Sequence, residues 1–209
     1  MYALVEDNNI TKLINNPKSI VIGDVRYPAK IFSVWSMSEL NAIGIYEVIT
    51  DSSNKKDEKW YINTDESYAF ADNQVTRSWG TATAKKHADT LWTAQDKTDD
   101  KIPEGKDVGD VAVEGLKTIL IKTLKTTVAN ELAKTDWYIT RNTEKSTAIP
   151  SDISTHRDNV RTKQASMETQ ILNASDTPAL ETLYTYVNTG TEENPVYERP
   201  LGELPTLES

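Results

Sequence analysis

Over the first eighty residues, apolar and polar residues alternate in short runs, whereas in the second half apolar residues recur every three or four positions. The first pattern is typical of short β-strands and the second of amphipathic helices. We therefore predict an α+β fold with a small antiparallel β domain over residues 1–80 and a helical domain over residues 111–190. Residues 81–110 are expected to be a partly helical, acidic linker, and residues 191–209 an extended, Pro-containing tail.

Turn-forming residues separate the expected strands. Asp7-Asn8-Asn9 lies between the runs 2–5 and 10–14, and these residue types tolerate positive φ, so the pair is predicted to be a hairpin. Gly23-Asp24 indicates a second hairpin, and Asp72-Asn73 a further turn. The remaining strands are expected at residues 45–49, 60–62, 68–70 and 75–79.

One short helix is expected to interrupt these strands. Ser36-Met37-Ser38-Glu39 is a capping box, in which the Ser36 hydroxyl accepts from the Glu39 amide and the Glu39 carboxylate reaches back to the Ser36 amide. Trp35 and Leu40 are placed as a hydrophobic staple around this cap. Gly44 supplies a left-handed residue that would end the helix.

Helical periodicity governs the second half. Residues 81–98 have moderate helical character, and residues 96–110 are polar and acidic enough to be a linker. A strong apolar stripe predicts a helix over residues 111–134, widened by Ile119 and Ile121. A second helix is predicted over about residues 152–173, antiparallel to the first, and a third from Thr177 as cap. The seam of the second helix consists of Ile153, Arg157, Val160, Gln164, Met167, Ile171 and Ala174.

Charge and composition exclude several classes of protein. The net charge of -9 disfavours a nucleic-acid binder, because phosphate contacts require clustered Lys and Arg. There is no Cys and there are only two His, so thiolate chemistry is excluded and we expect no metal site. No run reaches the roughly 18 apolar residues of a membrane span. The first residues lack the basic and apolar regions of a signal peptide, so we expect no membrane association and no export by that route.

The candidate chemistry is sparse. The chain has 32 Asp and Glu, and a hydrolase could pair two of them as acid and base, but their adjacent pairs lie in expected turns where carboxylates stay solvated. No Gly-x-Ser-x-Gly elbow is present, and we expect His156 to be an exposed or capping residue. We therefore expect no catalytic residues, no cofactor and no enzyme activity.

The most distinctive string is Thr135-Asp136-Trp137-Tyr138-Ile139-Thr140-Arg141, followed by Ile149-Pro150 and a helix with Arg157 and Arg161 four residues apart. We expect the first helix to end in this aromatic corner and to be followed by a polar loop. The string resembles the carboxy-terminal region of tail-fibre assembly proteins of tailed bacteriophages. The opening residues 1–10 and 22–28 are similar to those of small tail-region proteins of marine phages.

The resemblance implies a non-enzymatic protein that binds tail-fibre polypeptides and aids their assembly into trimers, and some members of the family stay attached to the finished fibre. Its expected partners are a tail-fibre or other tail protein and further copies of this chain, in a virion tail assembled in the host cytoplasm. The alternative is a symmetric virion subunit of tail, neck or capsid, without a chaperone role. The candidate partner-binding residues are Trp137, Tyr138, Arg141, Arg157 and Arg161.

Overall fold

The computed structural model describes residues 1–207, and they divide into two compact units, Met1–Thr83 and residues 84–207. The α+β class expected from the sequence is confirmed, because the first unit is built on a sheet and the second on helices. The division falls three residues beyond the end expected for the β domain, and residues 84–110 belong to the second unit. None of the helices within residues 1–207 is long and apolar enough to cross a bilayer.

The first unit contains a five-stranded sheet with strand order β2-β1-β5-β8-β7. Its neighbouring strands are antiparallel except for β5 and β8, which run parallel, so the antiparallel domain expected from the sequence is in fact mixed. The chain leaves β5, crosses to the outer edge at β7 and returns through a hairpin into β8. The strands are β1 (Tyr2–Glu6), β2 (Asn9–Ile14), β5 (Ile45–Thr50), β7 (Glu66–Ala71) and β8 (Gln74–Trp79).

Both predicted two-residue turns of this sheet are present. Asp7 and Asn8 have φ of 50° and 60°, and Asp72 and Asn73 have φ of 50° and 56°. Two central residues with positive φ are typical of the turn that matches the twist of paired strands. The second hairpin joins β3 (Ile20–Ile22) to β4 (Val25–Tyr27), and the short strand β6 (Tyr61–Ile62) pairs with β9 (Thr83–Ala84).

Two short helices cover one face of the sheet. The sequence pattern missed α1 (Ile31–Val34), which is a single turn, whereas α2 (Met37–Ala42) has the predicted capping box. Gly44 follows α2 with φ of +81°, and a Cβ there would lie 2.6 Å from the Val5 carbonyl oxygen. The larger core packs between these helices and the sheet and includes Leu4, Ile14, Ile20, Ile31, Leu40 and Ile45.

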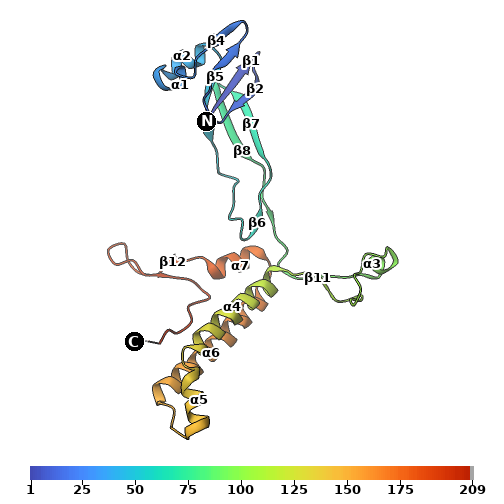
Figure 1. Cartoon of the computed structure of the whole chain (residues 1–209), viewed down its shortest axis with the longest axis vertical. Helices are drawn as coiled ribbons and strands as arrows, with labels where there is room; N and C mark the ends of the chain where they lie inside the picture. Colours follow the sequence, from blue (N-terminus) through green and yellow to red (C-terminus); the bar gives the residue numbers. More distant parts are fainter. Residues whose placement is uncertain (208–209) are drawn as a thin grey trace. The chain divides into compact units, whose positions relative to one another are not determined.

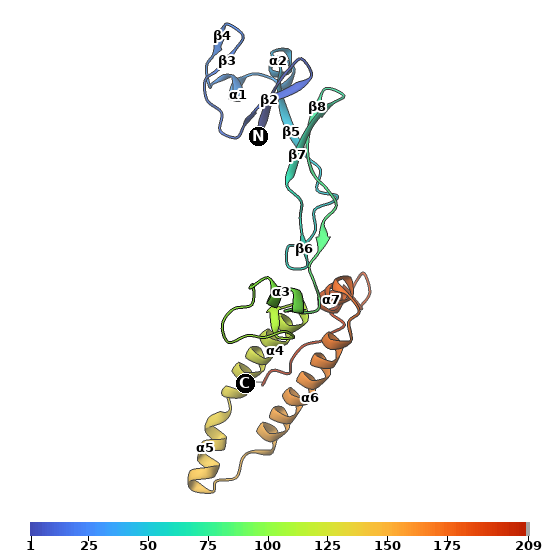
Figure 2. The same cartoon turned by 90° about the vertical axis from the view of Figure 1, so that its right-hand side faces the viewer.

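The second unit is organised around the predicted antiparallel helical hairpin. Helices α4 (Leu116–Ala133) and α6 (Ser151–Asn173) lie side by side in both views (Figures 1 and 2). Lys117 near the start of α4 donates to the Leu172 carbonyl near the end of α6 at 2.7 Å, which fixes the antiparallel sense. The predicted seam of α6 is confirmed, since six of its seven members are buried and Gln164 is half-buried. Ile119 is exposed and does not widen the seam of α4.

The moderate helical character expected of residues 81–98 is found only in the last five of them. That segment contains the strand β10 (Thr90–Leu91) and only a short helix, α3 (Ala94–Thr98), which starts at its own Thr93 capping box. Strand β11 (Val111–Val113) pairs with β10, so the acidic residues between them form the tip of an arm (Figure 1). Helix α4 consequently starts five residues later than predicted.

The start of α4 is set by Asp89. Its carboxylate accepts from the Gly115 amide at 2.6 Å and from the Thr118 hydroxyl at 2.9 Å. A helix that lacks its own capping side chain is thus capped from 26 residues away, because a carboxylate satisfies the free amides of a first turn. These hydrogen bonds, from Gly115 first and Thr118 second, lower the pKa of Asp89.

The last part of the chain contains α7 (Thr177–Tyr184) and a two-stranded hairpin of β12 (Val187–Asn188) and β13 (Tyr197–Glu198). Asp176 caps α7 instead of the expected Thr177, whose buried hydroxyl donates to the Lys85 carbonyl. Residues 191–207 contain no helix, but the segment expected to be an extended tail provides β13 of this hairpin. It is anchored by Leu201, which is fully buried and donates to the Leu183 carbonyl at 3.0 Å.

Candidate interaction site

Helix α4 does not run into a polar loop, as the sequence led us to expect, but turns into a further helix, α5 (Asp136–Lys145). Thr135, with φ of -118°, breaks the path between the two helices. The hydroxyls of Thr140 and Thr143 in α5 donate to the carbonyls of Asp136 and Ile139 one turn back, so these polar side chains are bonded within the helix. Ser146 closes the helix in the left-handed conformation, and the loop to α6 starts there.

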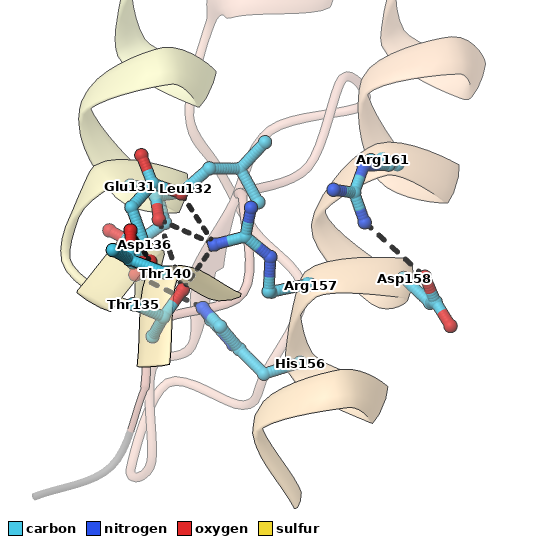
Figure 3. Close-up of polar contacts among 9 residues, drawn as sticks. All are labelled: Glu131, Leu132, Thr135, Asp136, Thr140, His156, Arg157, Asp158 and Arg161. Atoms are coloured by element: carbon cyan, nitrogen blue, oxygen red, sulfur yellow. Dashed lines mark hydrogen bonds and ion pairs between the residues drawn. The ribbon is translucent and has the colours of Figure 1, made fainter. Parts of the chain in front are cut away.

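Arg157 holds this corner together from α6. Figure 3 shows its guanidinium pointing across to the junction of α4 and α5. One nitrogen, Nη1, donates to the Leu132 carbonyl at 2.8 Å, to the Thr135 hydroxyl at 2.7 Å and to the Asp136 carboxylate at 2.9 Å. Arg157 is 8% exposed and Thr135 fully buried, so these bonds fix both the end of α4 and the first residue of α5.

A second buried pair lies beside Arg157. His156 Nε2 is 3.3 Å from the Glu131 carboxylate, and both side chains are at least nine-tenths buried. His156 was expected to be exposed or a cap, but it is neither, because the second turn of α6 faces α4 at this point. A hydrogen bond from Lys134 is the main cause that lowers the pKa of Glu131, and the Leu207 amide and the nearby His156 act in the same direction.

The outer face of α5 has a different character. Trp137 is 52% exposed, its ring lies 3.9 Å from that of Tyr138 between centroids, and the Arg141 guanidinium lies 5.1 Å above it. Ile139 on the same short helix is also exposed. None of the ten side chains of α5 is buried. We call Trp137, Tyr138 and Arg141 the stacked face of α5.

The structure thus separates the five candidate residues into three settings. Trp137, Tyr138 and Arg141 form one surface, whereas Arg157 is inside the fold and holds that surface in place. Arg161 is half exposed on α6 and pairs with Asp158 at 3.3 Å. Sequence reasoning missed the acceptors of Arg157. The signal was present, since a cation at a seam position requires an acceptor from the facing helix.

Comparisons with models of protein families, with curated proteins and with solved structures found no match.

Proposed function

We propose that this chain is a non-enzymatic tail protein of a tailed bacteriophage, which binds tail-fibre polypeptides, aids their assembly and is retained in the virion tail. It would fold in the host cytoplasm. The proposal rests on the resemblance of residues 135–161 to tail-fibre assembly proteins. The observation that supports it is the stacked face of α5, because the residues of that resemblance form both an exposed aromatic surface and the buried contacts that hold it.

The energetics of α5 favour a docking role. A ten-residue helix is marginal in water by itself, and α5 gains no stability from a buried apolar face. It is held instead at its ends, where Arg157 donates to the buried Thr135 hydroxyl just before the helix and the Asn142 amide donates to the Thr147 carbonyl at 2.8 Å. Trp and Tyr with an Arg beside them are the residue types that dominate binding energy at protein interfaces.

A symmetric virion subunit is a second candidate function. Two arms extend from the helical pair of the second unit, the β10–β11 arm and the β12–β13 hairpin (Figure 1). Both expose Val, Leu or Tyr side chains, as extended contacts between repeated subunits would require. This role would not need the stacked face.

Trp137→Ala provides the direct test of the stacked face. Because Trp137 is half exposed, the variant should fold as the wild type does, while its binding to the tail-fibre polypeptide of the same phage should weaken at least about tenfold. Leu172→Ala, at an equally exposed apolar position of α6, is the matched control and should bind normally. Unchanged binding by a folded Trp137→Ala variant would refute a role for this face.

Copy number separates the two functions. Quantitative mass spectrometry of purified phage particles would give the ratio of this chain to the fibre protein. A fixed ratio to the fibre supports the fibre-bound protein. A count set by the symmetry of the tail or neck, independent of the fibre, supports the structural subunit instead.

A further inference from the structure

The β12–β13 hairpin is a preformed ribbon whose apolar residues are unusually exposed. Tyr186, Val187, Val196 and Tyr197 are 53%, 49%, 50% and 65% exposed. Within residues 1–207 the ribbon has only two strands, and no third strand covers either edge. A two-stranded ribbon is at best marginally stable in water, so this one needs support from elsewhere.

Polar contacts supply that support at both ends of the ribbon. At the turn, the Asn188 side-chain oxygen accepts from the amides of Gly190 and Val196, at 3.0 Å each. At the base, the Arg199 guanidinium lies 5.5 Å from the Tyr184 ring and 5.6 Å from the Tyr186 ring. The hairpin is therefore ordered before any partner arrives, which lowers the entropy cost of binding to it.

The pairing leaves main-chain groups directed outward on both edges. The Thr189 amide donates to the Val196 carbonyl at 2.7 Å, so these two residues are hydrogen-bonded to each other between the two strands. The next pair along, Asn188 with Tyr197, then directs its amides and carbonyls away from the ribbon, because the pattern alternates in antiparallel strands. An added strand can bond to such an edge while its side chains meet the exposed Val and Tyr.

Charge identifies the kind of strand that fits. Residues 186–199 contain Glu192, Glu193 and Glu198 and one cation, Arg199, which pairs with Glu203 at 2.6 Å. We propose that the β12–β13 hairpin binds an extended, basic segment of a partner protein as an added β-strand, with Lys or Arg of that segment facing these carboxylates. This surface is separate from the stacked face of α5 and does not depend on the function proposed for it.

A second copy of this chain fits the hairpin poorly. Two hairpins paired edge to edge would bring two sets of these carboxylates together, and like charges across a ladder are destabilising. The β10–β11 arm is also acidic at its tip. Association through the hairpin is therefore expected with a basic strand and not with another copy.

Two fluorescent ten-residue peptides test the proposal on the full chain. Both alternate charged residues with Val and Tyr, one with Lys and the other with Glu, and binding is followed by fluorescence anisotropy. The Lys peptide should bind and the Glu peptide should not. Raising the salt concentration should weaken binding, because the charges are exposed and screened.

Variants locate the site. The double variant Glu192→Lys with Glu193→Lys, in the exposed turn, and the single variant Tyr197→Ser should each weaken binding of the Lys peptide at least about tenfold. Val113→Ser is the matched control, at an equally exposed position of the other arm, and should bind as the wild type does. Circular dichroism checks that each variant keeps its helices.

Three results would overturn the proposal. They are no binding of the Lys peptide, equal binding to the wild type and to the double Lys variant, and a dimer in light scattering that the same double variant abolishes. The last would assign the hairpin to a second copy of this chain.

Discussion

Arg157→Met removes the charged group at the junction of α4, α5 and α6 while keeping most of its apolar volume. Two of the three bonds of Arg157 go to the partly buried Leu132 carbonyl and the fully buried Thr135 hydroxyl. A hydrogen bond to a charged group contributes about 1.5–3 kcal/mol. In the variant the Leu132 carbonyl still accepts from the amide and the hydroxyl of Thr135, so it loses only one of its three hydrogen bonds. The Asp136 carboxylate is 60% exposed and adds little after solvent screening.

We therefore expect the variant to lower the free energy of unfolding of the second unit by about 3 kcal/mol. Because the chain has two units, a single melting curve would mix their transitions. Hydrogen exchange of the α4 and α6 amides, followed by mass spectrometry at increasing urea, reports the second unit alone.

Arg161→Met is the matched control for this prediction. Arg161 lies one turn further along α6, and its exposed pair with Asp158 contributes little. The control should change the stability by no more than about 0.5 kcal/mol. A loss below about 1 kcal/mol for Arg157→Met, or equal losses for both variants, would refute the role assigned to the buried guanidinium.

Three further predictions concern other contacts. Asp89→Ala should destabilise the second unit at neutral pH, because the start of α4 loses its cap, and faster amide exchange at the start of α4 measures the effect. The pKa of Glu131 is lowered on folding. The stabilisation that its carboxylate contributes to the fold is therefore present above the pKa of Glu131 in the unfolded chain, and it is lost as pH falls through the pKa of Glu131 in the folded chain. Glu131→Gln should accordingly flatten the acid limb of stability in urea titrations at falling pH. Gly44→Ala should destabilise the first unit by more than about 1 kcal/mol, because φ is +81° and the new Cβ meets the Val5 carbonyl. Urea titrations followed by amide exchange of β1 and β5 measure this loss. A smaller loss would contradict the structural role assigned to Gly44.

Local signals in the sequence predicted much of the fold. The capping box at Ser36 and Glu39 and the turns at Asp7-Asn8 and Asp72-Asn73 are confirmed, because each is settled within four residues of chain. The seam of α6 is likewise confirmed, since burial against one facing helix follows the helical period.

Contacts between distant residues escaped prediction. The first residue of α4 depends on Asp89, and α5 depends partly on Arg157, 21 residues from Asp136 in sequence. Residues 136–145 are polar in composition and resemble a loop in the sequence. The helix there depends on the contact of Arg157 with the end of α4 and on Ser146, which ends α5 in the left-handed conformation. The burial of His156 was missed for the same reason, because the Glu131 carboxylate that it faces is on another helix.

Photo-crosslinking from position 137 tests the central proposal most directly. A photoreactive phenylalanine analogue replaces Trp137 in the full chain during infection, and the same analogue at Leu172 is the control. Crosslinks in purified particles are identified by mass spectrometry. The proposal predicts crosslinks from position 137 to the tail-fibre polypeptide and none from position 172. Particles that contain the chain but give no fibre crosslink from position 137, or give equal crosslinks from both positions, would contradict it.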